Sequence, residues 1–158
     1  VLEYSCCAWC NLPAQQADRL ERFQRRVAKI ILRRNMFEHS DHDELLQEIG
    51  WPTLASRRCY RLAILGHKLA TKTAPKHLLD QVFPQRTTNY TFRHQPHFKL
   101  PTPGTELFKN SPLFRACAIY NGLNEETRKK LKISAFKADA SKELLSTDCP
   151  CKMHARNH

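Results

Sequence analysis

The sequence predicts a mostly α fold, a small helical bundle with a proline-rich, partly extended middle segment. Apolar residues recur at helical spacing over residues 14–34, 52–71 and 113–145. Six of the nine prolines fall within residues 73–112, a density that excludes long helices and favours extended or turn structure. We therefore expect one domain over residues 1–145, followed by a disordered tail at 146–158.

Charge is the clearest clue to a partner. Lys and Arg total 26 against 15 Asp and Glu, which gives a net charge of +11. This excess indicates a polyanionic partner, either nucleic acid or an anionic membrane surface. No apolar run approaches the roughly 20 residues of a membrane span, and no secretory signal is present. The seven unevenly spaced cysteines are typical of reduced thiols. We expect an intracellular protein of the nucleus or cytoplasm, with RNA and DNA as partners and no membrane.

The first predicted helix runs from Ala14 to Arg34 and carries two stripes. The apolar stripe, expected to be buried, holds Leu20, Phe23, Val27, Ile30 and Ile31. The second stripe lies beside it, spans roughly 80° of the helix, and holds Arg19, Arg22, Arg26, Lys29 and Arg33. Neighbouring cations on a helix repel one another. A solvated face is one interpretation of the second stripe, and a phosphate-binding face is the one we favour.

Residues 39–44 hold two histidines and three carboxylates, which suggests either a metal site or a helix start. We predict the helix start, with Ser40 or Asp41 as the cap and Asp43 or Glu44 closing a capping box. The helix would end at Gly50.

The third helix, from Pro52 to Thr71, repeats the two-stripe design, with Pro52 in its first turn. Its apolar side holds Leu54, Leu62, Leu65 and Leu69. Its basic side, within roughly 60°, holds Arg57, Arg61, Lys68 and Lys72. Packing of the two apolar faces would present one continuous cationic surface.

The middle segment permits a short β-hairpin, because residues 90–93 and 97–100 alternate in character around Pro96. Its aromatic and histidine side chains could stack on bases, although packing under a loop is the favoured interpretation; they are Tyr90, Phe92, His94, His97 and Phe98. A closing helix with a cap at Ser134 would bury Ile133, Phe136, Ala140 and Leu144.

Catalytic motifs are missing from the sequence. Its four glycines form no phosphate loop, and its six aspartates include no adjacent pair for two divalent ions. We therefore predict no enzymatic activity for this chain alone and no cofactor. Zinc is an alternative for the tail, but the Cys-x-Cys spacing leaves almost no loop before the first histidine, so we favour a basic tail without metal. The candidate ligands are Cys149, Cys151, His154 and His158.

Several segments in order resemble a known family. They are Tyr4-Ser-Cys-Cys-Ala-Trp9, Leu20-Glu-Arg-Phe-Gln-Arg-Arg-Val-Ala-Lys-Ile-Ile31, Leu45-Leu-Gln-Glu-Ile-Gly-Trp-Pro-Thr-Leu-Ala-Ser-Arg-Arg58 and Ser134-x-Phe136-Lys137 with Leu144. Together they resemble the region after the polymerase domain in reverse transcriptases of animal non-long-terminal-repeat (LINE-type) retrotransposons. The resemblance covers residues 1–145. Where the family commonly has Trp-Asn-x-Leu-Pro, this chain reads Tyr120-Asn-Gly-Leu-Asn124.

The resemblance implies a non-catalytic, thumb-like or accessory segment of an RNA-directed DNA polymerase. Such a segment grips RNA template and DNA primer while the upstream polymerase domain performs synthesis. We place that grip on the two basic stripes by physical argument. A module that docks on the polymerase domain is a second hypothesis, and a non-functional fragment of a degraded element is a third.

Overall fold

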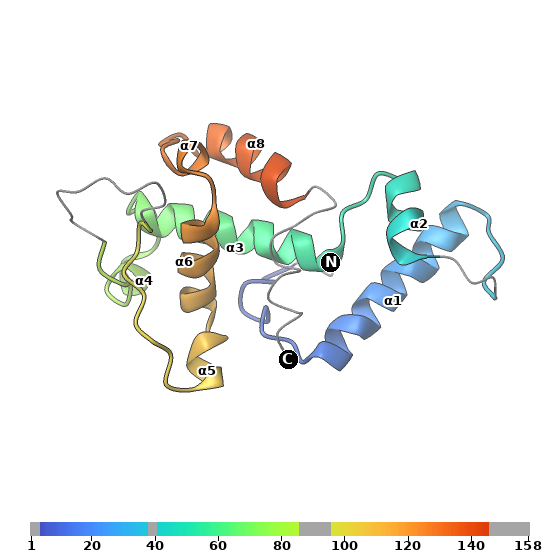
Figure 1. The fold of residues 1–158 in the computed structure, drawn as a ribbon, viewed down its shortest axis with the longest axis horizontal. Helices are drawn as coiled ribbons and strands as arrows, with labels where there is room; N and C mark the ends of the chain where they lie inside the picture. The colour runs from blue at the N-terminus through green and yellow to red at the C-terminus, as the bar shows by residue number, and fades with distance from the viewer. Residues whose placement is uncertain (1–3, 38–40, 86–95, 146–158) are drawn as a thin grey trace.

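The computed structural model describes residues 4–37, 41–85 and 96–145. Within these ranges the protein is helical and has no strand, so the predicted mostly α fold is confirmed (Figure 1). No helix of the described ranges is both long enough and apolar enough to cross a membrane. The helices are α1 (Ala14–Ile31), α2 (His42–Glu48), α3 (Leu54–Ala70), α4 (Lys76–Leu79), α5 (Glu106–Lys109), α6 (Pro112–Gly122), α7 (Glu125–Arg128) and α8 (Ile133–Leu144).

Helix α3 is the centre of the molecule, and α6 and α8 pack against it (Figure 1). Its predicted apolar face is confirmed, since Leu54, Leu62 and Leu69 are buried and Leu65 is half-buried. Phe136, Ala140 and Leu144 of α8 are also buried, as the spacing predicts, but the predicted burial of Ile133 is wrong, because this first residue of α8 is 37% exposed. The main core therefore lies between α3, α6 and α8, with Tyr120 and Phe98 among its largest side chains.

Gly66 allows α3 and α6 to approach closely. A Cβ atom at this position would lie 2.7 Å from the carbonyl oxygen of Ala116 and 2.7 Å from the Cβ of Tyr120. Real Cβ atoms do not come this near to other atoms, so only glycine fits without a shift of one helix. The crossing of α3 and α6 is thus fixed by the absence of a side chain.

The middle segment forms less β-structure than the sequence predicts. Phe98 makes one isolated antiparallel bridge with Gln85, and residues 97–100 form no strand. The Phe98 backbone is satisfied instead by Asn121, whose side chain accepts from its N–H and donates to its carbonyl, both at 2.9 Å. The predicted burial of Phe98 is confirmed. Residues 90–93, including Tyr90 and Phe92, and His94 lie outside the described residues.

The helix ends depart from the predictions in three places. Asp41 occupies the cap position of α2 but its side chain makes no cap hydrogen bond, and Ser40 lies outside the described residues. Helix α3 begins after Thr53, whose hydroxyl accepts from the Ser56 N–H, so Pro52 precedes the helix. Ser134 lies inside α8, so it is not the cap. The backbone of a capping residue has non-helical dihedral angles, and the spacing of apolar residues alone does not show where the backbone makes that change.

The predicted burial of the α1 apolar stripe is wrong at three of its five positions, while Leu20 and Val27 are half-buried. Phe23, Ile30 and Ile31 are 53%, 63% and 52% exposed, whereas Gln24 and Ala28 are buried. Helix α1 contacts α2 and α3 through a neighbouring face of small and polar residues. Ala28 packs there with Leu45 and Leu46 of α2 in a small cluster separate from the main core. The apolar stripe is consequently left on the surface, between this face and the basic stripe.

Candidate nucleic-acid interface

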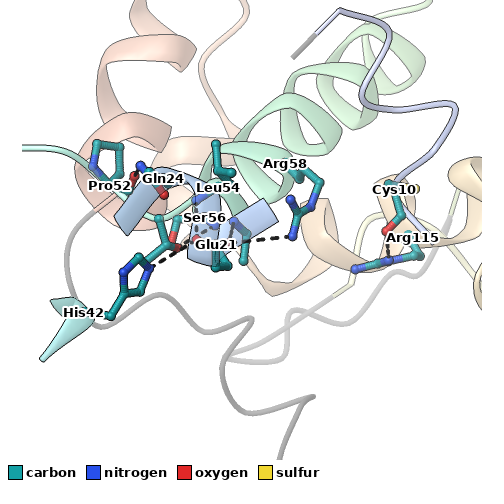
Figure 2. A network of polar contacts seen from close by, with 11 residues as sticks. Cys10, Glu21, Gln24, His42, Pro52, Leu54, Ser56, Arg58 and Arg115 are labelled. Carbon is teal, nitrogen blue, oxygen red and sulfur yellow. Dashed lines mark hydrogen bonds and ion pairs between the residues drawn. The ribbon is translucent and has the colours of Figure 1, made fainter. Parts of the chain in front are cut away.

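The carboxylate of Glu21 fixes α1 to the start of α3 (Figure 2). It accepts hydrogen bonds from the backbone N–H groups of Leu54 at 3.3 Å and Ala55 at 2.9 Å, which are among the first N–H groups of α3 and have no partner within the helix. His42 of α2 lies 3.3 Å and Arg58 of α3 lies 3.9 Å from its oxygens. Burial acts to raise the pKa of Glu21, but the His42 contact, the two backbone hydrogen bonds and Arg58 lower it below its ordinary value. The basic face of α1 is thereby oriented by a polar clamp.

A second set of polar contacts holds the N-terminal turn, residues 4–11, against α3 and α6. Arg115 of α6 donates to the carbonyl oxygen of Cys10 (Figure 2). Cys10 itself is buried beside Leu62 and Ala116. The guanidinium of Arg58 lies 6.0 Å from the centre of the Trp9 ring, within cation–π range. The turn is therefore anchored although it carries no regular structure.

Helix α1 presents four of the five predicted cations. Arg19, Arg22, Arg26 and Arg33 are exposed. Lys29 is only 6% exposed, and its Nζ donates to the carbonyl oxygen of Met36 at 3.3 Å. Lys29 therefore holds the loop after α1 and does not belong to the surface stripe, because its long side chain reaches back over the helix end.

Helix α3 and the residue beyond its cap present three of the four predicted cations. Arg61, Lys68 and Lys72 are exposed, and Arg57 is half-buried. Arg61 and Lys68 line one surface hollow. The apolar faces of α1 and α3 do not pack against each other as predicted, because Glu21 of α1 binds the first turn of α3 and Gln24 donates to the carbonyl oxygen of Pro52 just before it. The packing from which we predict one continuous cationic surface is therefore not formed, and that surface stays a prediction.

The exposed stripe cations differ from several other cations in their pairing. Within residues 4–37, 41–85 and 96–145, six of them form no ion pair with a carboxylate: Arg19, Arg22, Arg26, Arg33, Lys68 and Lys72. By contrast, Arg34 pairs with Glu48, and Lys129 pairs with Glu125 at 2.7 Å. The stripe cations thus concentrate positive charge that the described carboxylates do not neutralise.

Arg33 and Lys72 occupy backbone positions that favour glycine. Helices α1, α2 and α3 each end in a Schellman motif, in which the residue two positions past the helix adopts a positive φ. In α2 this residue is Gly50, with φ of 68°. In α1 and α3 it is Arg33 and Lys72, with φ of 52° and 56°. The six-to-one hydrogen bonds run from Arg34 N–H to the Lys29 carbonyl and from Thr73 N–H to the Lys68 carbonyl. The chain therefore places a cation where glycine would be less strained.

Comparison with protein-family models, with curated proteins and with solved structures finds no match. Among the described residues, no group of three His, Cys, Asp or Glu side chains could hold a metal ion. The tail candidates Cys149, Cys151, His154 and His158 lie outside the described residues.

Tyr4 lines the surface hollow beside α3, but the sequence does not predict Tyr4 as a site residue. The only signal in the sequence is the aromatic and apolar character of residues 4–9, which is equally typical of core.

Proposed function

We propose that this chain is a non-catalytic segment of a retrotransposon RNA-directed DNA polymerase that binds the backbone of RNA and DNA through the basic faces of α1 and α3. The family in this proposal rests on the sequence resemblance. The binding mode rests on the exposed cations of the two helices.

The observation that carries the proposal is the set of six stripe cations without a carboxylate partner among the described residues. Where surface cations serve solubility alone, pairing with nearby acids reduces the repulsion between neighbouring cations. Helix α1 carries two acids: Glu21 is bound by the N-terminus of α3 and by His42, and exposed Asp18 forms no ion pair with the described stripe cations. The α1 cations therefore remain available to phosphates, whose neutralisation releases counterions and drives binding.

The test is fluorescence-anisotropy titration of the chain with a blunt RNA–DNA hybrid at several salt concentrations. We expect log K to fall linearly with log salt, by about 0.9 per phosphate contact. The double variant Arg22→Glu with Arg26→Glu should lower the slope by about two contacts, roughly 1.8, without a change in sequence preference.

A matched control separates position from total charge. Lys137 and Lys142 are exposed on α8, so Lys137→Glu with Lys142→Glu removes the same charge from a different helix. We expect the control to bind nearly as the parent chain does. Equal loss in both double variants would show that only net charge matters, and it would refute the assignment to α1.

The second candidate function, docking on the polymerase domain, is favoured by the exposed apolar stripe of α1. Exposed apolar side chains that lie together mark interaction surfaces, and here a basic stripe flanks Phe23, Ile30 and Ile31. An acidic, partly apolar surface of the polymerase domain would match both stripes. This candidate predicts weak, salt-insensitive binding of nucleic acid by the chain alone. It also predicts that Phe23→Ser with Ile30→Ser improves solubility.

A further inference from the structure

A surface hollow of about 590 Å³ lies between the N-terminal turn and α3. From the turn, Tyr4 and Cys7 line it, and from α3, Arg61, Ile64, Leu65 and Lys68 line it. These four positions of α3 follow the spacing of a single helical face. Its size falls in the range of about 300–1,000 Å³ that is usual for small-ligand sites.

The walls of the hollow are held in place from outside it. The indole Nε1 of Trp9 donates to the carbonyl oxygen of Tyr4 at 3.0 Å. Trp9 in turn lies under Arg58, and the neighbouring Cys10 is fixed by Arg115. The backbone of Tyr4 is therefore anchored while its side chain is 84% exposed. Because the backbone is already anchored, a ligand that binds the ring has to order only the side-chain rotamer and not the turn.

The chemistry of the lining selects among ligands. Burial, followed by the neighbouring Cys6, raises the pKa of Cys7 to about 11, so this thiol is neutral at physiological pH and is a poor metal ligand or nucleophile. Among the described residues that line the hollow there is no carboxylate, which disfavours a cation. The lining instead combines an aromatic ring, an aliphatic floor at Ile64 and Leu65, and two cations on the same face of α3, Arg61 and Lys68. A nucleotide presents the matching parts, a flat base and flanking phosphates.

We propose that the hollow binds one unpaired nucleotide, with its base stacked on Tyr4 over Ile64 and Leu65 and its flanking phosphates beside Arg61 and Lys68. The inference rests on the proposed nucleic-acid binding and narrows it to strands with an unpaired end. A base within a duplex is stacked between its neighbours and does not present a face to a side chain. The α1 stripe, in contrast, contacts only the backbone and accepts duplex.

The experiment compares three ligands by anisotropy at one salt concentration: a blunt RNA–DNA hybrid, the same hybrid with a short unpaired DNA overhang, and that overhang made abasic. Base–aromatic stacking corresponds to about 5- to 150-fold in affinity. We expect the normal overhang to tighten binding within that range and the abasic overhang to give no comparable gain. Tyr4→Ala should lose most of the gain, and Tyr4→Phe should keep it.

The outcomes separate this inference from the proposed function. Salt-dependent binding of the blunt hybrid with no gain from the overhang refutes the hollow and leaves the backbone grip intact. Binding of the overhang without binding of the blunt hybrid refutes the backbone grip and supports the hollow. A gain that survives the abasic overhang shows phosphate contact alone, and a gain that survives Tyr4→Ala shows that Tyr4 does not hold the base; either result overturns the stacking. Circular dichroism melts of both Tyr4 variants should match the parent, because the Tyr4 side chain lies outside the core.

Discussion

The strain at Lys72 predicts that removing its Cβ and removing its charge will have opposite effects on stability. An L-residue in the left-handed region costs about 1–2 kcal/mol, and glycine avoids this cost. Lys72→Gly also gives the unfolded chain more freedom, which offsets about 0.4–1 kcal/mol of the relief. Lys72→Gln keeps the Cβ and the strain but loses the attraction of the ammonium to the C-terminal end of α3, about 0.3–1 kcal/mol.

Lys72→Gly should therefore be the more stable variant by about 1 kcal/mol, which is about 2–4 °C in Tm for a chain of this size. Both variants remove the same cation, so both should lower the salt slope of hybrid binding by about 0.9. Thermal melts by circular dichroism and anisotropy titrations on the same two proteins measure the two effects separately. A Lys72→Gly protein that melts no higher than Lys72→Gln would refute the strain argument. An unchanged slope in both would remove Lys72 from the interface.

Three further predictions follow from the packing, the clamp and the thiols. Gly66→Ala should destabilise the fold by about 1–3 kcal/mol, because the added methyl meets the backbone of α6; Gly104→Ala, where a Cβ meets nothing within 4 Å, is its control in chemical denaturation. The pKa of Glu21 is lower in the folded than in the unfolded chain, so the stability it contributes is present above its ordinary pKa of 4.5 and is lost as pH falls through the lower folded value. In a series of denaturation experiments at different pH, Glu21→Gln should therefore weaken the loss of stability at acid pH. An unchanged loss of stability in this variant would contradict the clamp. Labelling of Cys7 by iodoacetamide, followed by mass spectrometry, should be slow at neutral pH and faster as pH approaches 11. Rapid labelling of Cys7 in the folded chain at pH 7 would contradict the raised pKa.

The sequence predicts α3 well because its four leucines meet neighbours that cover them. The same reasoning fails for α1, although its apolar stripe is the more regular one. A periodic pattern shows that a helix has two sides, but it does not show which side the rest of the chain covers. In α1 the covered side is defined by Glu21 and Gln24, whose partners Ala55 and Pro52 lie about 30 residues away.

The sequence likewise predicts some parts of the candidate site and misses others. Exposure of Arg22 and Arg26 could be predicted from their spacing, because a stripe of cations is expensive to bury. The burial of Lys29 could not, since it depends on the course of the loop that brings the Met36 carbonyl to its Nζ. The hollow beside Tyr4 depends on contacts such as Arg115 to Cys10, which join residues 105 positions apart. No local pattern carries that information.

The separation of the α1–α2 cluster from the main core has a consequence for cooperativity. Ala28, Leu45 and Leu46 bury far less apolar surface than the core between α3, α6 and α8, so the first two helices form a unit that opens at lower free energy. The amide protons of α1 should therefore exchange through local opening while those of α3 wait for global unfolding. A polyanion bound along α1 favours the closed form of this unit by mass action. As the ligand concentration rises, slower hydrogen exchange of the α1 amides should therefore be detected before any rise in the Tm of the whole chain.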